Sequence, residues 1–141
     1  MPNTRKSIFL DTAYVYALVN TRDEWHDAAL MWQEKLEQDR RQIITTELIL
    51  VEIADGLASI RFRDQAARII DALQSSRFVE IVAVSSELLT LALDLYRERR
   101  DKEWGLTDCL SFVAMRQRGW LDCLTVDVHF QQAGFYPLLR N

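Results

Sequence analysis

The sequence predicts an α/β fold in which a mainly parallel sheet of about five strands lies between two layers of helices. Two observations carry this prediction. The chain has 141 residues, 49% of them hydrophobic, with only four Gly and two Pro, so it can build one packed core. Short apolar runs alternate along it with longer helical segments, and this alternation is typical of β-α-β crossovers. We therefore expect a three-layer α/β/α sandwich in a single domain over residues 1–141.

Five short apolar runs are interpreted as strands. The third, Phe-Val-Glu-Ile-Val-Ala-Val, is the clearest of them. The last contains Pro137, which lacks a backbone N–H, so we expect that strand at an edge of the sheet. The runs cover residues 6–10, 43–45, 78–84, 121–126 and 135–139.

The segments between these runs are interpreted as helices. The second has apolar residues at helical spacing, and Gly119 is expected to end the last one. Ser85 or Ser86 can cap the helix that runs to Arg100. The other expected helices cover residues 12–19, 25–41, 47–60, 63–75 and 107–119, and residues 127–133 form a loop or a short helix.

The remaining composition bounds the class of protein. No apolar run approaches the roughly 18 to 20 residues needed to cross a bilayer, and residues 1–7 are polar, so we expect a cytoplasmic protein without membrane contact. Cys109 and Cys123 lack CxxC spacing and are expected to be reduced, buried thiols. The net charge of −4 does not indicate nucleic-acid binding, but 14 of the 17 basic residues are Arg, which suits phosphate contacts.

Acidic residues stand where the expected strands end and helices begin. Asp11 directly follows the first strand, Asp127 follows the fourth, and Asp108 opens a helix. In parallel sheets ligands bind at the carboxyl ends of the strands, so we expect these side chains near one edge. Glu52 lies among apolar neighbours on its helix, where an unpartnered carboxylate would be costly to bury.

Each of these acids also has a structural alternative. Asp11 and Asp127 are equally placed to form a turn or cap a helix, and Asp108 to cap its own helix. Glu52 can instead meet solvent or pair with an arginine. Four acids expected at one edge favour a shared site for Mg²⁺ or Mn²⁺, which can drive phosphoryl displacement. That chemistry needs no His or Cys, and neither residue type is expected to be well placed.

Several motifs resemble the PIN-domain family, most closely the VapC-like toxins. The likeness covers residues 7–139, and its most specific part is Thr107-Asp108 together with Thr125-x-Asp127-x-x-Phe130. The resemblance implies a sheet between helices, a Mg²⁺ or Mn²⁺ site, and cleavage of single-stranded RNA. By motif position the catalytic and metal-binding acids are Asp11, Glu52, Asp108 and Asp127, with Thr12 and Thr125 as supporting polar residues. Glu47 competes with Glu52, which we prefer because it occupies the motif's place on the helix.

The resemblance also implies partners. VapC-like toxins usually pair as homodimers, and a cognate antitoxin encoded beside the toxin blocks the acidic site, although many relatives are free-standing PIN proteins. The aromatic N-terminal segments could form the homodimer contact or the antitoxin contact, or they could instead belong to the core. They contain Tyr14, Tyr16, Trp25 and Trp32.

Two arginine clusters are candidates for holding RNA phosphates beside the acids. The alternative is ordinary solvated helix faces. The clusters are Arg61, Arg63 and Arg68, and Arg97, Arg99 and Arg100. Asp101 and Glu103 are interpreted as solvated turn residues.

Other function classes fit less well. A haloacid-dehalogenase-like enzyme would need Asp-x-Asp after the first strand, whereas Asp11 is followed by Thr12 and Ala13. A receiver domain would need an early acidic pair and a late lysine, and no lysine follows Lys102. A non-catalytic RNA- or partner-binding module is the remaining alternative, and it would be expected to have lost at least one of the four acids.

Overall fold

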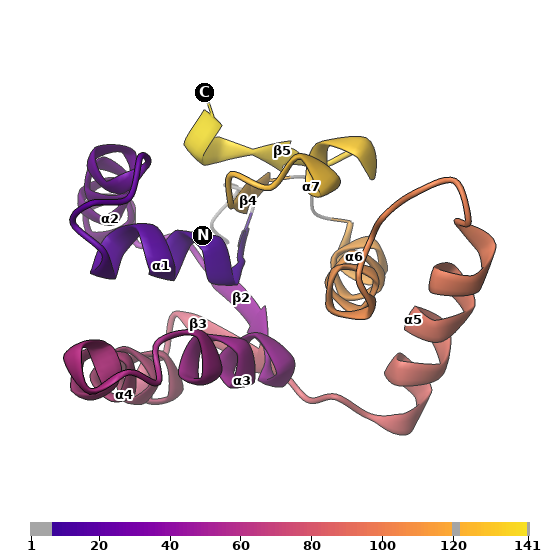
Figure 1. The fold of residues 1–141 in the computed structure, drawn as a ribbon, viewed down its shortest axis with the longest axis horizontal. Coiled ribbons are helices and arrows are strands. Elements are labelled where there is room, and N and C mark those ends of the chain that lie inside the picture. Colours follow the sequence, from indigo (N-terminus) through magenta and orange to yellow (C-terminus); the bar gives the residue numbers. More distant parts are fainter. Residues whose placement is uncertain (1–6, 120–121, 141) are drawn as a thin grey trace, which may run out of the picture.

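The computed structural model describes residues 7–119 and 122–140, and Figure 1 shows its helices and strands. The strands are β1 (Ile8–Leu10), β2 (Ile43–Thr46), β3 (Val79–Val82), β4 (Asp122–Leu124) and β5 (Tyr136–Pro137). The helices are α1 (Thr12–Val19), α2 (His26–Asp39), α3 (Glu47–Gly56), α4 (Ile60–Ser75), α5 (Ser86–Glu98), α6 (Leu106–Arg118) and α7 (Val128–Gln132), and the 3-10 helix η1 (Leu138–Arg140) follows β5.

The five strands form one sheet in the order β3-β2-β1-β4-β5, and every neighbouring pair is parallel. The predicted sheet is therefore confirmed. Strand β1 lies at its centre, between β2 and β4, and its residues are buried throughout. Pro137 lies on the edge strand β5, opposite Cys123 of β4, as its missing N–H required.

Helices cover the sheet on both sides, as predicted. Figure 1 shows α1 and α2 on one side of the strands and α5 and α6 on the other. Helix α1 contacts α2, α3 and α4, whereas α5 packs mainly against α6. None of the helices in the described part of the chain is long and apolar enough to span a membrane. The single domain over residues 1–141 stays a prediction.

The core between β1, β4 and α6 is aromatic. Phe112 of α6 lies between the rings of Trp104 and Phe130, with edge-on centroid distances of 5.0 and 4.9 Å. Edge-to-face pairs of this kind stabilise a core beyond their buried area. Cys109 and Cys123 are buried and free, as predicted.

Element boundaries differ from the prediction at several places. Strand β3 is shorter than the predicted 78–84, and α2 is shorter than the predicted 25–41. The segment predicted as a helix to residue 60 ends at Gly56, and Ile60 opens α4 with Ser59 as its N-cap. Strand β4 ends at Leu124, because the N–H of Thr125 turns back to the carbonyl of Cys123. The last strand ends at Pro137 and is followed by η1, whose Leu139 donates to the Thr125 carbonyl. Residues 6 and 121, predicted to lie in strands, fall outside the described residues.

Candidate functional site

At the carboxyl ends of β1 and β4, two acidic residues form hydrogen bonds with the hydroxyl group of Thr125. Asp11 follows β1, and its backbone N–H donates to the carbonyl of Leu124 at the end of β4, at 3.3 Å. The Thr125 Oγ1 donates to Asp11 Oδ2 at 2.7 Å and accepts from the Asp127 backbone N–H at 3.0 Å. Thr125, which the motif marks as a supporting residue, thus connects the two strand ends.

The carboxyl group of Asp11 lies in an unusual environment. The residue is 8% exposed, and burial raises the pKa of its side chain from 3.8 to about 7, against the lowering effect of the Thr125 hydrogen bond. The charges of Asp127 and Asp108 raise that pKa further. Although Asp11 is the N-cap of α1, its side chain makes no capping hydrogen bond. The structural alternative for Asp11, a helix cap, is therefore not what the side chain does.

Glu52 reaches the same region from α3. Thr12 Oγ1 donates to Glu52 Oε1 at 2.9 Å, and the Tyr16 hydroxyl donates to the Glu52 backbone carbonyl at 2.9 Å. Helices α1 and α3 come this close because Gly56 has no side chain: a Cβ there would lie 1.8 Å from the Tyr16 hydroxyl oxygen. Burial raises the pKa of Glu52, the Thr12 hydrogen bond lowers it, and the charge of Asp108 raises it.

Glu47, the competing acid on the same helix, has a different partner. Its Oε1 accepts the backbone N–H of Val84 at 2.8 Å, and the residue is exposed. This contact joins the start of α3 to the segment that follows β3. The geometry therefore gives Glu47 a structural contact and brings Glu52, through Thr12, to the end of β1.

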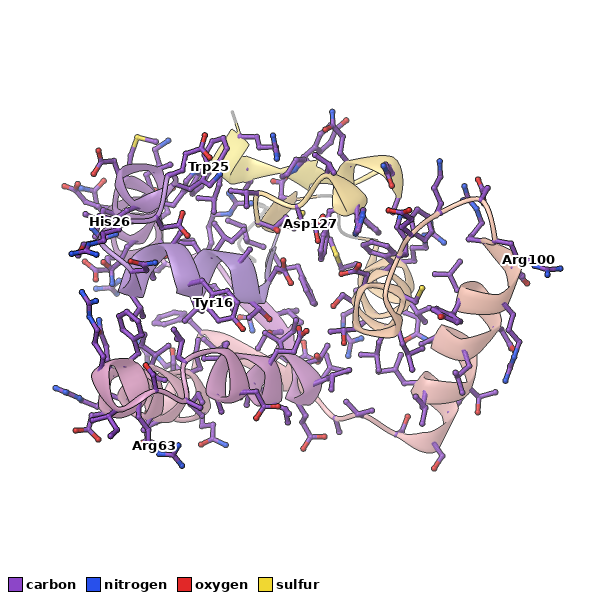
Figure 2. All side chains as sticks on the ribbon, viewed as in Figure 1. Tyr16, Trp25, His26, Arg63, Arg100 and Asp127 are labelled. Carbon is purple, nitrogen blue, oxygen red and sulfur yellow. The ribbon has the colours of Figure 1, made fainter. Side chains whose placement is uncertain are left out.

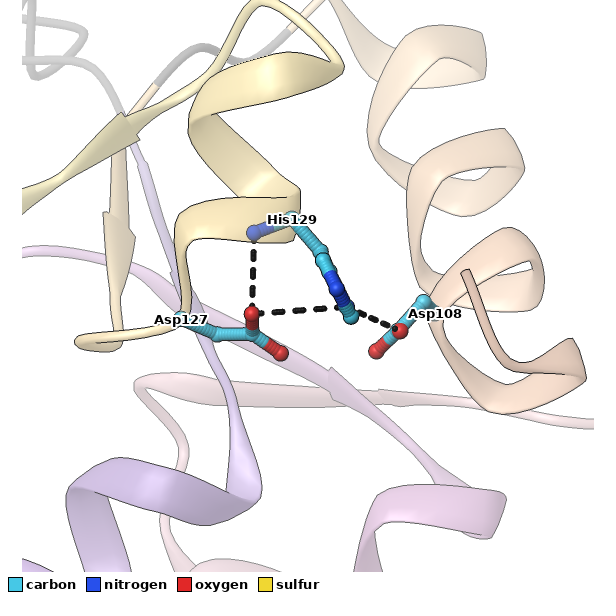
Figure 3. A group of neighbouring side chains, drawn as sticks. All are labelled: Asp108, Asp127 and His129. Carbon is cyan, nitrogen blue, oxygen red and sulfur yellow. Dashed lines mark hydrogen bonds and ion pairs between the residues drawn. The ribbon is translucent and has the colours of Figure 1, made fainter. Parts of the chain in front are cut away.

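Asp108, Asp127 and His129 form the tightest group of possible metal ligands (Figure 3). One ligand atom from each lies within 4.8 Å of the others. His129 Nδ1 is 3.1 Å from Asp108 Oδ2 and 3.5 Å from Asp127 Oδ1, and the His129 backbone N–H donates to Asp127 Oδ1 at 2.9 Å. Asp108 Oδ2 also accepts the N–H of Gly105 at 3.1 Å, so it caps α6 as well.

The expectation that no histidine is well placed was wrong for His129. It held for His26, whose Nδ1 lies 2.7 Å from the Ala17 carbonyl oxygen and so is used within the fold. The signal for His129 was its position two residues after Asp127, at the first turn of α7. Asp127 caps that helix through the His129 N–H, and this contact directs the imidazole back over the acids.

The four predicted acids share one electrostatic environment. Burial and then the charge of Asp127 raise the pKa of Asp108, and the charge of Asp108 raises the pKa of both Asp11 and Glu52. Asp11 and Glu52 do not belong to the tight group of Asp108, Asp127 and His129. The charges of Asp11 and Glu52 interact with that of Asp108, and Asp11 is also linked to Asp127 through the hydrogen bonds of Thr125. A site where neighbouring negative charges raise the pKa of Asp11, Glu52 and Asp108 is one that a divalent cation would stabilise.

The two arginine clusters lie apart from each other. Figure 2 shows Arg63 and Arg100 at opposite margins of the molecule, with Asp127 between them. On α4, Arg63 donates to the Ala58 carbonyl at 3.2 Å and Arg68 to the Asp64 carbonyl at 3.4 Å. A role for either cluster in RNA binding stays a prediction.

Comparison with known proteins gives a consistent result. The family model described as the PIN domain matches residues 8–136. The chain is 27% identical over 128 residues to the 23S rRNA-specific endonuclease VapC20 of Mycobacterium tuberculosis, covering 91% of this chain and 95% of that protein. The crystal structure of VapC20, described as a Sarcin-Ricin loop cleaving toxin, matches with a TM-score of 0.78 over 92% of this chain and 97% of that one. FitAcB from Neisseria gonorrhoeae, 16% identical, shares the fold with a TM-score of 0.64 over 92% of this chain and 97% of that one.

Proposed function

The chain belongs to the PIN-domain family, and we propose that it is a metal-dependent endoribonuclease that cleaves single-stranded RNA regions as the toxin of a type II toxin–antitoxin pair. The observation that carries the nuclease assignment is the group of Asp108, Asp127 and His129 beside the buried Asp11 at the carboxyl edge of the sheet. The similarity to VapC20, which acts on 23S rRNA, supports RNA as the substrate class and a toxin as the biological role.

The residues present fit a divalent cation. Carboxylate oxygens of Asp108 and Asp127 with the Nδ1 of His129 are a donor set of the right chemistry, and Asp11 and Glu52 add charge around it. A bound Mg²⁺ or Mn²⁺ would supply Lewis acidity for activating a water and for stabilising the charge that develops on the scissile phosphate.

The chain's own residues orient this donor set. Thr125 holds Asp11 Oδ2, and Thr12 holds Glu52 Oε1, so neither carboxylate is free to rotate. The Gly105 N–H fixes Asp108, and the His129 N–H fixes Asp127. Preorganised carboxylates of this kind reduce the reorganisation needed when charge develops during the reaction.

A groove between α1, α2 and α4 is a candidate surface for binding a partner. This apolar groove has a volume of about 820 Å³, and its walls include Leu18, Leu30, Leu36, Ile69 and Leu73. Leu30, at 44% exposed, presents apolar surface to solvent at this groove. We propose that a cognate antitoxin covers this surface; homodimer formation stays a prediction. Tyr14, a candidate for the antitoxin contact, the homodimer contact or the core, is 3% exposed and belongs to the core.

The function is tested with purified protein and a labelled single-stranded RNA. We expect cleavage with Mn²⁺ or Mg²⁺, complete loss with EDTA, and recovery when the metal is returned in excess. A chain that binds RNA but shows no metal-dependent cleavage would support the non-catalytic binding module instead. A small neighbouring reading frame encoding a DNA-binding protein would favour the toxin over a free-standing RNA-processing nuclease.

His129 is expected to bias the site toward Mn²⁺. An imidazole nitrogen suits transition metals, whereas Mg²⁺ prefers oxygen ligands. Replacing His129 with Ala should therefore weaken Mn²⁺ binding about tenfold or more and Mg²⁺ binding much less. The measurement is the electron paramagnetic resonance signal of free Mn²⁺ during titration, with Mg²⁺ as competitor. Equal weakening of both metals would mean that His129 only orients Asp108 and Asp127.

A further inference from the structure

A basic groove lies between the end of α5 and the start of α6. Its volume is about 900 Å³, and its lining includes Tyr96, Arg97, Arg99, Arg100, Lys102 and Trp104. Four of the ten lining residues are cationic and one, Glu103, is anionic, although the chain as a whole carries a net charge of −4. Two acids outside the lining pair with these cations: Asp94 with Arg97 at 3.4 Å, and Asp101 with Arg99 and Lys102 at 2.9 and 3.8 Å. The lining itself has more cations than anions, and a polyanion is the ligand class that such a surface favours.

Arg99 is held in place in the groove without being withdrawn from solvent. Arg99 donates to both carboxylate oxygens of Asp101, at 2.9 and 3.0 Å, and its guanidinium lies 4.8 Å from the Trp104 ring centroid. These contacts fix its planar donor group, and the Arg99 side chain keeps an exposed fraction of 36%. Asp101 engages the Nε and Nη2 donors of this guanidinium, so a phosphate would meet Arg99 from its Nη1 side.

The groove adjoins the acidic site through two of its lining residues, Gly105 and Trp104. Gly105 lines the groove, and its N–H donates to Asp108 Oδ2. Trp104 Nε1 donates to Gln132 Oε1 at 2.9 Å, which joins the groove wall to α7, the helix that Asp127 caps. The groove therefore begins next to Asp108, close to where the acids would hold a phosphate of an RNA strand.

Tyr96 adds an aromatic surface to this cationic groove. Tyr96 is 52% exposed, whereas tyrosines in folded domains are usually buried to a greater extent. Exposed aromatic rings beside cations are the feature with which proteins bind single-stranded nucleic acid, since each base can stack on a ring while its phosphate meets a cation.

We propose that this groove binds the nucleotides of a single-stranded RNA next to the cleaved phosphate. Arg97, Arg100 and Lys102 contact phosphates, Arg99 is the fixed anchor, and Tyr96 stacks on a base. This inference rests on the proposed function and extends it by naming the path of the substrate. The arginines of α4 are not among the residues that line the groove, and Figure 2 shows Arg63 at the far margin of the molecule.

The test compares two variants that each remove three positive charges. One is Arg97→Ala/Arg100→Ala/Lys102→Ala in the groove, and the matched control is the triple alanine variant of Arg61, Arg63 and Arg68 on α4. Binding of a fluorescein-labelled 12-nucleotide RNA is followed by anisotropy in EDTA, so that cleavage does not interfere, over a range of salt concentrations. Thermal unfolding of each variant shows whether it is folded.

We expect the groove variant to bind RNA at least tenfold more weakly, with a salt slope reduced by about two, because it loses three phosphate contacts to a single strand. The control variant should lose much less affinity. Tyr96→Ala should weaken binding roughly fivefold or more while leaving the salt slope unchanged, because stacking releases no counterions.

Two outcomes would overturn the proposal. Equal weakening by the two triple variants would show that only overall charge matters, and unchanged binding by the groove variant would place the RNA elsewhere. If the wild-type chain cleaves RNA with Mn²⁺ in either case, the proposed function stands and only the groove is refuted. If the wild-type chain neither binds nor cleaves RNA, both are refuted.

Discussion

Replacing Asp11 with Asn is expected to lower RNA cleavage by about a thousandfold or more while leaving the chain folded. Asn has the shape of Asp and can still accept the hydrogen bond from Thr125, so the packing around it is kept. What is lost is the negative charge at the metal site, and several kcal/mol of transition-state stabilisation correspond to several factors of ten in rate. Initial rates of RNA cleavage with saturating Mn²⁺ measure this effect.

The stability of the same variant separates a functional Asp11 from a structural one. In metal-free protein the pKa of Asp11 is raised from 3.8 to about 7, so the folded state keeps a proton that the unfolded state releases between these values. Below about pH 4 Asp11 is protonated in both states and does not change the free energy of unfolding. As pH rises toward 7, the unfolded state releases the proton first, so the wild type loses stability. Asp11→Asn removes this loss.

We therefore expect the melting temperature of Asp11→Asn in EDTA to match the wild type near pH 4 and to exceed it increasingly up to about pH 7. Thermal unfolding at several pH values provides the measurement. A helix cap would behave in the opposite way, costing about 1 kcal/mol of stability when removed and leaving activity intact. A destabilised but fully active Asp11→Asn would contradict the assignment of this residue to the site.

Replacing Glu52 with Gln is expected to reduce cleavage by about a hundredfold or more, whereas Glu47→Gln should leave it close to the wild-type rate. The two residues lie on the same helix and undergo the same chemical change, so each controls for the other. Glu52 is half-buried, its Oε1 is held by Thr12, and its charge interacts with Asp108. Glu47 is exposed and accepts the N–H of Val84, a contact that the Gln oxygen can still make.

Two measurements decide between these acids. Initial cleavage rates give the functional effect, and calorimetric Mn²⁺ titration shows whether metal affinity falls with Glu52→Gln alone. Because Gln keeps the Thr12 contact and adds no bulk, both variants should unfold within a few degrees of the wild type. An inactive Glu47→Gln beside an active Glu52→Gln would mean that the motif position on α3 was misassigned.

Most of the fold could be predicted because strand and helix periodicities are local properties of the chain. The three residues before Asp11, Ile8 to Leu10, are all apolar, as a strand covered on both faces must be, and they form the central strand β1. The boundaries near Ser59 and Pro137 were less predictable. At both places short-range hydrogen bonds compete with the longer element, and the periodic pattern does not report them.

The sequence by itself determined which acids approach the carboxyl edge of the sheet. Asp11 and Asp127 follow parallel strands, and the ends of parallel strands meet at one edge whatever the details of packing. Asp108 is placed in the same way, because the helices of this fold begin at that edge. These positions depend on the order of elements, which periodicity and turn residues specify.

Only the tertiary structure decided which side chains touch. The hydrogen bond between Thr125 and Asp11 joins residues 114 positions apart, and it depends on the register that sets Leu10 opposite Leu124. The turn of the His129 ring toward Asp108, and the position of the α5–α6 groove next to that acid, depend on how α7 and α6 pack. Contacts of this range arise from relative orientation and rotamer choice, and neither leaves a periodic trace in a single sequence.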